Sequence, residues 1–149
     1  MSKLKKLSDA FERYDITSDL ASSSNPDAPY LAKVILTILG ENNSFSKRVN
    51  SQFEAATAKE AEKKALDLAI DRIFGDKITA PLNQFPFFDI TISYMSTGNK
   101  EQSVGVKSSV SVFNDKNQIV RRVQSMAIGK EAAQVENEAL KSAINKLGV

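Results

Sequence analysis

Basic side chains in segments of alternating polarity are the candidates for a functional site in this sequence. In SVGVKSSVSVFNDKNQIVRR, residues 103–122, valines alternate with serines and Lys107, and after a turn the chain returns with Arg121 and Arg122. Period-two alternation predicts strands with one buried and one solvated face. Cations on a solvated face can neutralise phosphates. The pattern therefore indicates a phosphate-binding surface, although a basic face balanced by neighbouring acids has the same appearance.

A second basic pair lies earlier in the chain, in FSKRVNSQF, residues 45–53, where Lys47 and Arg48 interrupt a roughly alternating segment. Lys130 and Lys141 lie in the last predicted helix. The candidate nucleic-acid-binding residues are therefore Lys47, Arg48, Lys107, Arg121, Arg122, Lys130 and Lys141.

The composition excludes many kinds of reactive site. The 149 residues contain no cysteine and no histidine, which excludes disulfides, thiol chemistry, triads built on imidazole, and thiolate or imidazole metal sites. Carboxylates on predicted helices, such as those of Asp67, Asp71, Glu136 and Glu138, could bind a metal in principle, but such groups are usually solvated or ion-paired. With no phosphate loop and no nucleophile motif, we expect no enzyme, no catalytic residue, no metal and no cofactor.

The net charge of the chain is too small to attract a polyanion by itself. Twenty basic and 18 acidic residues give a formal charge of +2, so a nucleic-acid site depends on local clustering rather than on bulk charge. No apolar run approaches the roughly 20 residues that span a bilayer, and the basic start MSKLKK leads into a polar helix. We expect a soluble, cytoplasmic protein that has no membrane partner.

The first half of the chain is predicted to contain a helix, a hinge, a second helix, a strand and a third helix. Leu4, Leu7, Phe11 and Tyr14 line one face of an N-terminal helix that docks on its own domain or on a neighbouring subunit. Residues 16–29 have the composition of a loop, residues 30–40 are ambiguous but favour a helix, and residues 45–53 favour a strand. A capping box, Thr57 and Glu60, begins a helix that ends before Gly75.

The second half is predicted to be an irregular segment followed by a meander and a helix. Phe85, Phe87 and Phe88 are expected to pack in a core or an interface rather than stack on bases. Strands follow at 89–95, 103–113 and 119–128, with a turn at NDKNQ and a bulge that turns both Arg121 and Arg122 to solvent. A helix spans 129–149.

The predicted fold class is therefore α+β, a helix-strand-helix followed by a three-stranded antiparallel β-meander packed on a C-terminal helix. Residues 1–29 form an N-terminal helix and hinge, and residues 30–149 form the main domain. SKRVNSQ at 46–52 also resembles VRRVQSM at 120–126, and a helix containing KEA follows each segment. This echo is either a duplication or a coincidence.

The order of these elements, and several short strings within them, resemble the single-strand DNA annealing proteins related to Rad fifty-two, a superfamily that includes phage Erf and Sak proteins. The strings are LDLAIDRIFG at 66–75, DIT at 89–91, SVGV at 103–106, the turn at 114–117 and ALKSAINKLGV at 139–149. The resemblance covers about four fifths of the chain, from Tyr30 onward.

The resemblance implies a ring or filament of identical subunits that holds single-stranded DNA in a basic groove, anneals complementary strands without ATP, and works with a single-strand-binding protein or an exonuclease. Arg48 corresponds to a groove arginine of the family, and Lys141 to the first basic residue of its closing helix. Ser142 and Asn145 stand where the family often has arginines.

Two other functions fit the same pattern. A strand-strand-strand-helix order with Gly-Lys-Glu-Ala at 129–132 also suits a double-stranded RNA-binding module, although Lys130 is followed there by Glu131. A self-assembling structural protein would share the oligomer but would have no affinity for nucleic acid.

Overall fold

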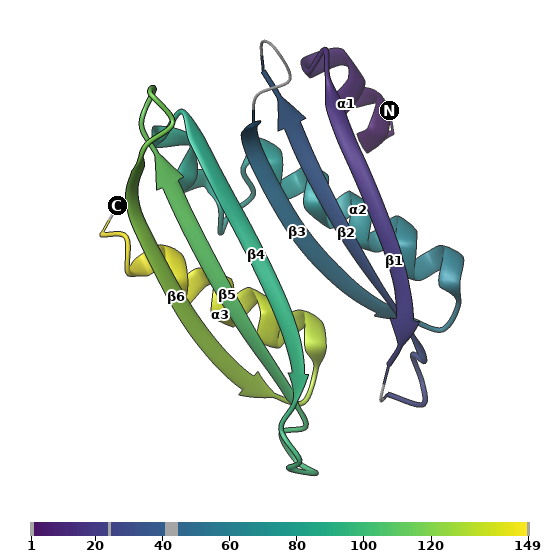
Figure 1. Ribbon diagram of the computed structural model, residues 1–149. Helices are drawn as coiled ribbons and strands as arrows, with labels where there is room; N and C mark the ends of the chain where they lie inside the picture. Colours follow the sequence, from purple (N-terminus) through teal and green to yellow (C-terminus); the bar gives the residue numbers. More distant parts are fainter. Residues whose placement is uncertain (1, 24, 41–44, 149) are drawn as a thin grey trace. The chain divides into compact units, whose positions relative to one another are not determined.

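The computed structural model describes residues 2–23, 25–40 and 45–148, and the chain divides into two compact units, Met1–Phe74 and Gly75–Val149. Each unit contains three antiparallel strands followed by a long helix (Figure 1). The predicted fold class, with a single three-stranded meander after a helix-strand-helix, is therefore wrong, because the described residues form six strands. The division after Phe74 also differs from the predicted boundary at residue 29.

Unit 1 is built on the strands β1 (Tyr14–Ser22), β2 (Tyr30–Leu39) and β3 (Phe45–Ala55). The central strand β2 pairs antiparallel with both neighbours, so that Leu36 lies opposite Ile16 on one side and Val49 on the other. The predicted helix at 30–40 is wrong, and so is the predicted loop over the part of 16–29 that forms β1. Burial along β2 alternates from residue to residue, which is the period of a strand and not of a helix.

The helix α2 (Ala58–Phe74) covers one face of this sheet. Its buried stripe includes Ala61, Ala65, Ala69 and Ile73, at helical spacing. Gly75, with φ of 96°, follows the last helical residue in the left-handed conformation that commonly ends a helix. The prediction for this helix is confirmed.

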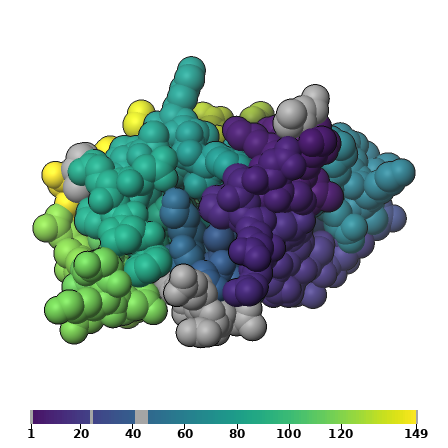
Figure 2. Space-filling model, turned by 90° about the horizontal axis from the view of Figure 1, so that it is seen from above, coloured from purple at the N-terminus to yellow at the C-terminus, as the bar shows by residue number. Residues whose placement is uncertain are grey.

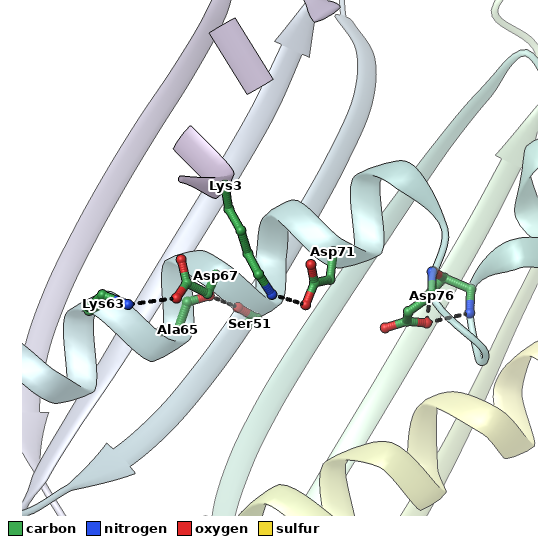
Figure 3. Close-up of polar contacts among 8 residues, drawn as sticks. Lys3, Ser51, Lys63, Ala65, Asp67, Asp71 and Asp76 are labelled. Atoms are coloured by element: carbon green, nitrogen blue, oxygen red, sulfur yellow. Dashed lines mark hydrogen bonds and ion pairs between the residues drawn. The ribbon is translucent and has the colours of Figure 1, made fainter. Parts of the chain in front are cut away.

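The N-terminal helix α1 (Lys3–Ala10) docks on the C-terminal part of α2 in its own unit. Leu7 is fully buried, Lys3 Nζ lies 2.5 Å from an Asp71 carboxylate oxygen (Figure 3), and the ring centroids of Phe11 and Phe74 are 5.6 Å apart. The chain then enters β1 at Tyr14. In the space-filling view, this N-terminal segment (purple) forms much of the visible surface of unit 1 (Figure 2).

Unit 2 begins with a compact connection. Oδ1 of Asp76, which is labelled in Figure 3, accepts hydrogen bonds from the main-chain N–H groups of Ile78 and Thr79, each at 2.9 Å. A short 3-10 helix, η2 (Ala80–Gln84), follows. Phe88 is fully buried, whereas Phe85 and Phe87 are half-buried, so the predicted core packing is confirmed for Phe88.

The strands β4 (Phe87–Ser96), β5 (Val104–Phe113) and β6 (Ile119–Gly129) form an antiparallel meander, and α3 (Ala132–Asn145) packs against β5 and β6. The turn between β5 and β6 is closed by Asn114, whose Oδ1 accepts from the main-chain N–H groups of Lys116 and Gln118. The strands, turn and helix predicted for this half are confirmed.

A serine ties the sheet to its helix in each unit. Ser51 Oγ on β3 donates to the main-chain oxygen of Ala65 at 2.6 Å (Figure 3), and Ser125 Oγ on β6 lies 2.7 Å from Ser142 Oγ on α3. Because side chains alternate along a strand, Arg48, Asn50, Arg122 and Gln124 point to the opposite face of their sheets.

No helix among the described residues has the length and apolar character needed to cross a membrane.

Candidate functional site

Each sheet has one face covered by its helix and one turned away from it, which we call the open face. On the open face of unit 2, the strand register aligns side chains in rows across β4, β5 and β6. One row is Asp89, Ser111 and Arg122, and the next is Thr91, Ser109 and Gln124. These six side chains line a shallow, polar hollow of about 240 Å³. The centre of this face is therefore a set of hydrogen-bonding groups with one guanidinium and one carboxylate.

Arg122 lies across this hollow and is held there by a neighbouring strand. Its Nε donates to Ser111 Oγ at 3.0 Å, while the side chain stays exposed. A guanidinium carries five N–H donors in a fixed plane, so one hydrogen bond to serine leaves donors that can meet a phosphate.

Lys107 supplies a second cation on the same face. It lies opposite Ser93 on β4 and Met126 on β6 and is half-buried. Lys107 is four residues along β5 from Ser111, which is about 13 Å at the rise of a strand. The two cations would therefore contact different phosphates of one bound strand.

The far end of this face is apolar. Met95, Gly105 and Ile128 form one row across the three strands, and Met126 lies beside them on β6. Ile128 and Met126 are 50% and 57% exposed. A Cβ at Gly105 would lie 2.9 Å from Met95 Cγ, so the glycine leaves room for that side chain. Such a surface can pack against apolar or aromatic rings.

The open face of unit 1 carries similar groups in similar rows. Asp15, Thr37 and Arg48 form one row, and Asp19, Lys33 and Gln52 form another. Asp15 is exposed, Lys33, Thr37 and Arg48 are half-buried, and Gln52 is buried. Basic and hydroxyl side chains are thus close together in each unit.

The seven residues predicted as DNA-binding fall on different surfaces. Arg48 lies on the open face of unit 1, and Lys107 and Arg122 share the open face of unit 2. Lys47 and Arg121 point to the helix-covered sides of their sheets. Lys130 and Lys141 are exposed, the first just after β6 and the second on α3.

The prediction that Arg121 and Arg122 share the solvated side of the sheet is wrong: both are exposed, but they lie on opposite sides. The bulge in this hairpin falls at Val120, since Phe113 pairs with Ile119 and Val112 with Arg121, so the two arginines alternate normally. Arg121 donates to the main-chain oxygen of Leu147, just beyond α3. A cation at the C-terminal end of a helix stabilises its carbonyl groups, so Arg121 has a structural role.

Burial shifts the pKa of two charged groups in unit 1. Burial lowers the pKa of Lys47 below its ordinary value, and burial raises the pKa of the Glu54 carboxyl. Glu54 also accepts a hydrogen bond from Ser23 Oγ.

The carboxylates considered as metal ligands have other surroundings. Asp67 pairs with Lys63 at 3.1 Å and Asp71 with Lys3 (Figure 3), whereas Glu136 is fully buried. Across the residues that the structure describes, no group of three or more acidic side chains could hold a metal ion.

Sequence reasoning missed the polar groups of β1 and β2, namely Asp15, Thr17 and Lys33, because both segments were assigned to other structures. A signal was present, since the string DIT occurs at 15–17 and again at 89–91. In both places its first and third residues lie on the open face of the first strand of a meander.

No protein-family model matches the chain, and no curated protein matches it significantly.

Proposed function

We propose that this protein binds single-stranded DNA on its open faces and anneals complementary strands without ATP, as an oligomer. The observation that carries the proposal is the open face of unit 2, where Lys107 and the exposed Arg122 share one surface with hydroxyl and amide groups. Phosphate contacts by cations and hydroxyls hold a strand independently of its sequence.

The apolar end of the same face supports a single strand as ligand. Met95, Met126 and Ile128 form an exposed apolar surface beside Lys107. In an unpaired strand, bases can rest on apolar or aromatic side chains while the backbone follows the cations. A duplex keeps its bases stacked inside and would leave this apolar surface uncovered.

Annealing requires no bond making. A platform must neutralise phosphates and leave base edges free to pair with a second strand. Each subunit of this protein offers a modest basic surface at a net charge of only +2, so binding strength would come from repeating that surface in an oligomer.

The edge strand β6 supports self-association. It is 11 residues long, and it exposes Ile119 and Val120 in addition to Met126 and Ile128. A long, apolar edge strand is a template for pairing with another chain. β1 is one of the outer strands of unit 1 and β6 one of the outer strands of unit 2, so a contact of β6 with β1 of another copy can repeat into a ring or a filament.

The test of binding uses Arg122→Ala, with Arg121→Ala as the matched control on the adjacent residue. Fluorescence anisotropy with a labelled oligothymidylate, over a range of salt concentrations, measures both affinity and its salt dependence. We expect Arg122→Ala to weaken binding about tenfold and to reduce the salt slope by about 0.7, the value for one phosphate on a single strand. Arg121→Ala should instead lower the free energy of unfolding by about 1–3 kcal/mol with an unchanged salt slope.

Annealing is tested separately, with complementary oligonucleotides, purified protein and no nucleotide, at low and at moderate salt. Acceleration at either salt concentration is expected. No acceleration at both would contradict the annealing activity, and a clear preference for duplex RNA over single-stranded DNA would favour the RNA-binding alternative.

A further inference from the structure

The two units follow each other with a constant offset. β5 spans 104–113 where β2 spans 30–39, β6 spans 119–129 where β3 spans 45–55, and α3 begins at 132 where α2 begins at 58. Each pair of elements is thus separated by 74 residues. The sequence echo between 46–52 and 120–126 has the same offset. The two units are therefore structural repeats in which β2 and β5 have equal lengths, and so do β3 and β6.

Many identities between the repeats have a packing explanation. Ala65 and Ala139, Ala69 and Ala143, and Ile70 and Ile144 are buried on the sheet-facing sides of their helices. Ser51 and Ser125 both bond to the covering helix. A close-packed interior limits which residues fit at such positions, so these identities say nothing of a ligand.

Four residues on the open faces are also identical between the repeats, and packing against the helix does not explain them. The pairs at the offset of 74 are Asp15 and Asp89, Thr17 and Thr91, Lys33 and Lys107, and Arg48 and Arg122. These side chains point away from the helix, and each of the eight has at least one chain neighbour that differs between the repeats. A solvated strand position tolerates many residue types, which makes the retention of all four types on one face informative.

The retained residues also keep the same arrangement. In unit 1, Asp15, Thr37 and Arg48 form one row across the sheet, and in unit 2 the corresponding row is Asp89, Ser111 and Arg122. Each row thus has a carboxylate on the first strand, a hydroxyl on the second and a guanidinium on the third. The lysine lies on the second strand of each unit, four residues before that hydroxyl.

We infer that each unit carries one phosphodiester-binding site of the same design, so that one chain holds two segments of single-stranded DNA. The inference rests on the proposed function for the identity of the ligand. The arginine and lysine would contact phosphates, since a guanidinium and an ammonium both donate to phosphate oxygens. The carboxylate would repel phosphates from the first strand and could accept hydrogen bonds from base N–H groups.

The two sites are not expected to be equally strong. Arg122 and Gln124 are exposed, whereas Arg48 is half-buried and Asn50 is buried. The apolar residues Met126 and Ile128 of unit 2 correspond to Gln52 and Glu54 of unit 1. The site of unit 2 therefore offers more reachable donors, less negative charge and more apolar surface, and should bind more tightly.

Native mass spectrometry with an oligothymidylate of six residues tests the stoichiometry. We expect two oligonucleotides per chain for the wild-type protein, whatever its oligomeric state, with two different affinities. Arg48→Ala and Lys33→Ala should each remove the weaker binding event, and Arg122→Ala should remove the tighter one. The control Lys63→Ala, on an exposed part of α2, should keep both.

The outcomes separate this inference from the proposed function. One oligonucleotide per chain, lost in Arg122→Ala and retained in both Arg48→Ala and Lys33→Ala, would overturn the second site and leave single-strand binding intact. An absence of any binding by the wild-type protein would overturn the proposed function, and the paired sites with it. Circular dichroism of each variant checks that a lost binding event does not reflect unfolding, and Lys33→Ala serves as the second variant of unit 1 if Arg48→Ala does not fold.

Discussion

Adjacent residues of a strand can have unrelated roles, and the two arginines of β6 illustrate this. Arg121 bonds to the end of its helix, and Arg122 bonds to Ser111 on the open face. A shift of the strand register by one residue would exchange these positions. The sequence shows the two cations but not the register, because the position of the bulge at Val120 depends on pairing with β5.

Glu54 should make the stability of unit 1 depend on pH. Its folded-state pKa lies above the ordinary value of 4.5, so its favourable contribution to stability is complete below pH 4.5 and is lost as the pH rises through the raised pKa. We therefore expect Glu54→Gln to raise the melting temperature, relative to the wild type, more at pH 7 than at pH 4. Thermal unfolding at both pH values measures this difference.

The matched control for this measurement is Glu62→Gln, on an exposed part of α2. The same relative melting temperature for Glu54→Gln at pH 4 and at pH 7 would show that burial of the Glu54 carboxyl does not affect folding.

At the scale of the element, the helices are held to their sheets by apolar packing and by one serine each. Ser51 is fully buried, and its hydroxyl donates to the main chain of α2. We expect Ser51→Ala to lower the free energy of unfolding by about 1 kcal/mol, the usual net value of one hydrogen bond. Urea denaturation monitored by circular dichroism measures this change.

Ser125→Ala should have an effect of the same size in unit 2, because its partner Ser142 would also lose a bond. Ser93→Ala, at an exposed position on β4, should change stability by less than about 0.5 kcal/mol. If Ser51→Ala and Ser93→Ala have the same free energy of unfolding, the hydrogen bond of Ser51 does not stabilise the fold.

The elements of the second half could be predicted because their patterns are clear. β5 alternates valine with small polar residues, and the apolar residues of α3 recur at helical spacing. In β2, however, Leu31, Ile35 and Leu39 lie on the open face between the buried residues, so apolar side chains occupy both faces and hide the period of two. β1 is hard to predict for a different reason. Most of its residues are exposed, so apolar residues do not recur along it with a period of two.

At the scale of the whole molecule, the predicted fold is wrong because it lacks β1 and β2, and the sequence echo alone does not distinguish a duplication from a coincidence. Once β1 and β2 are recognised, the first half has the same order of elements as the second. Local patterns could identify Arg48, Lys107 and Arg122 as candidates. The rows that join them to Asp15, Asp89 and Ser111 depend on strand pairing, which residue types alone do not specify.

Assembly into a ring or filament should depend on the apolar edge of β6. We expect the double variant Ile119→Lys, Val120→Lys, at exposed apolar positions of β6, to shift the protein from an oligomer to a monomer, because charges on an edge strand oppose pairing with another chain. Native mass measurement of the particle detects the change. Leu4→Lys, at an exposed apolar position of α1, is the control and should leave the oligomer intact.

A double variant with the oligomeric mass of the wild type would exclude β6 as the contact between copies. In the monomer, affinity for a long oligonucleotide should fall more than affinity for a short one, because fewer linked sites would hold the long strand.

The constant spacing of the two repeats also bears on the ancestry of the chain. An ancestral segment that encoded one unit would have supplied three strands and a helix with a complete open face, and one tandem copying event would account for the constant offset between β2 and β5, β3 and β6, and the starts of α2 and α3. After such an event, each half can specialise while the other preserves the original activity. Gln52 and Glu54 in one half and Met126 and Ile128 in the other are the differences that this freedom allows.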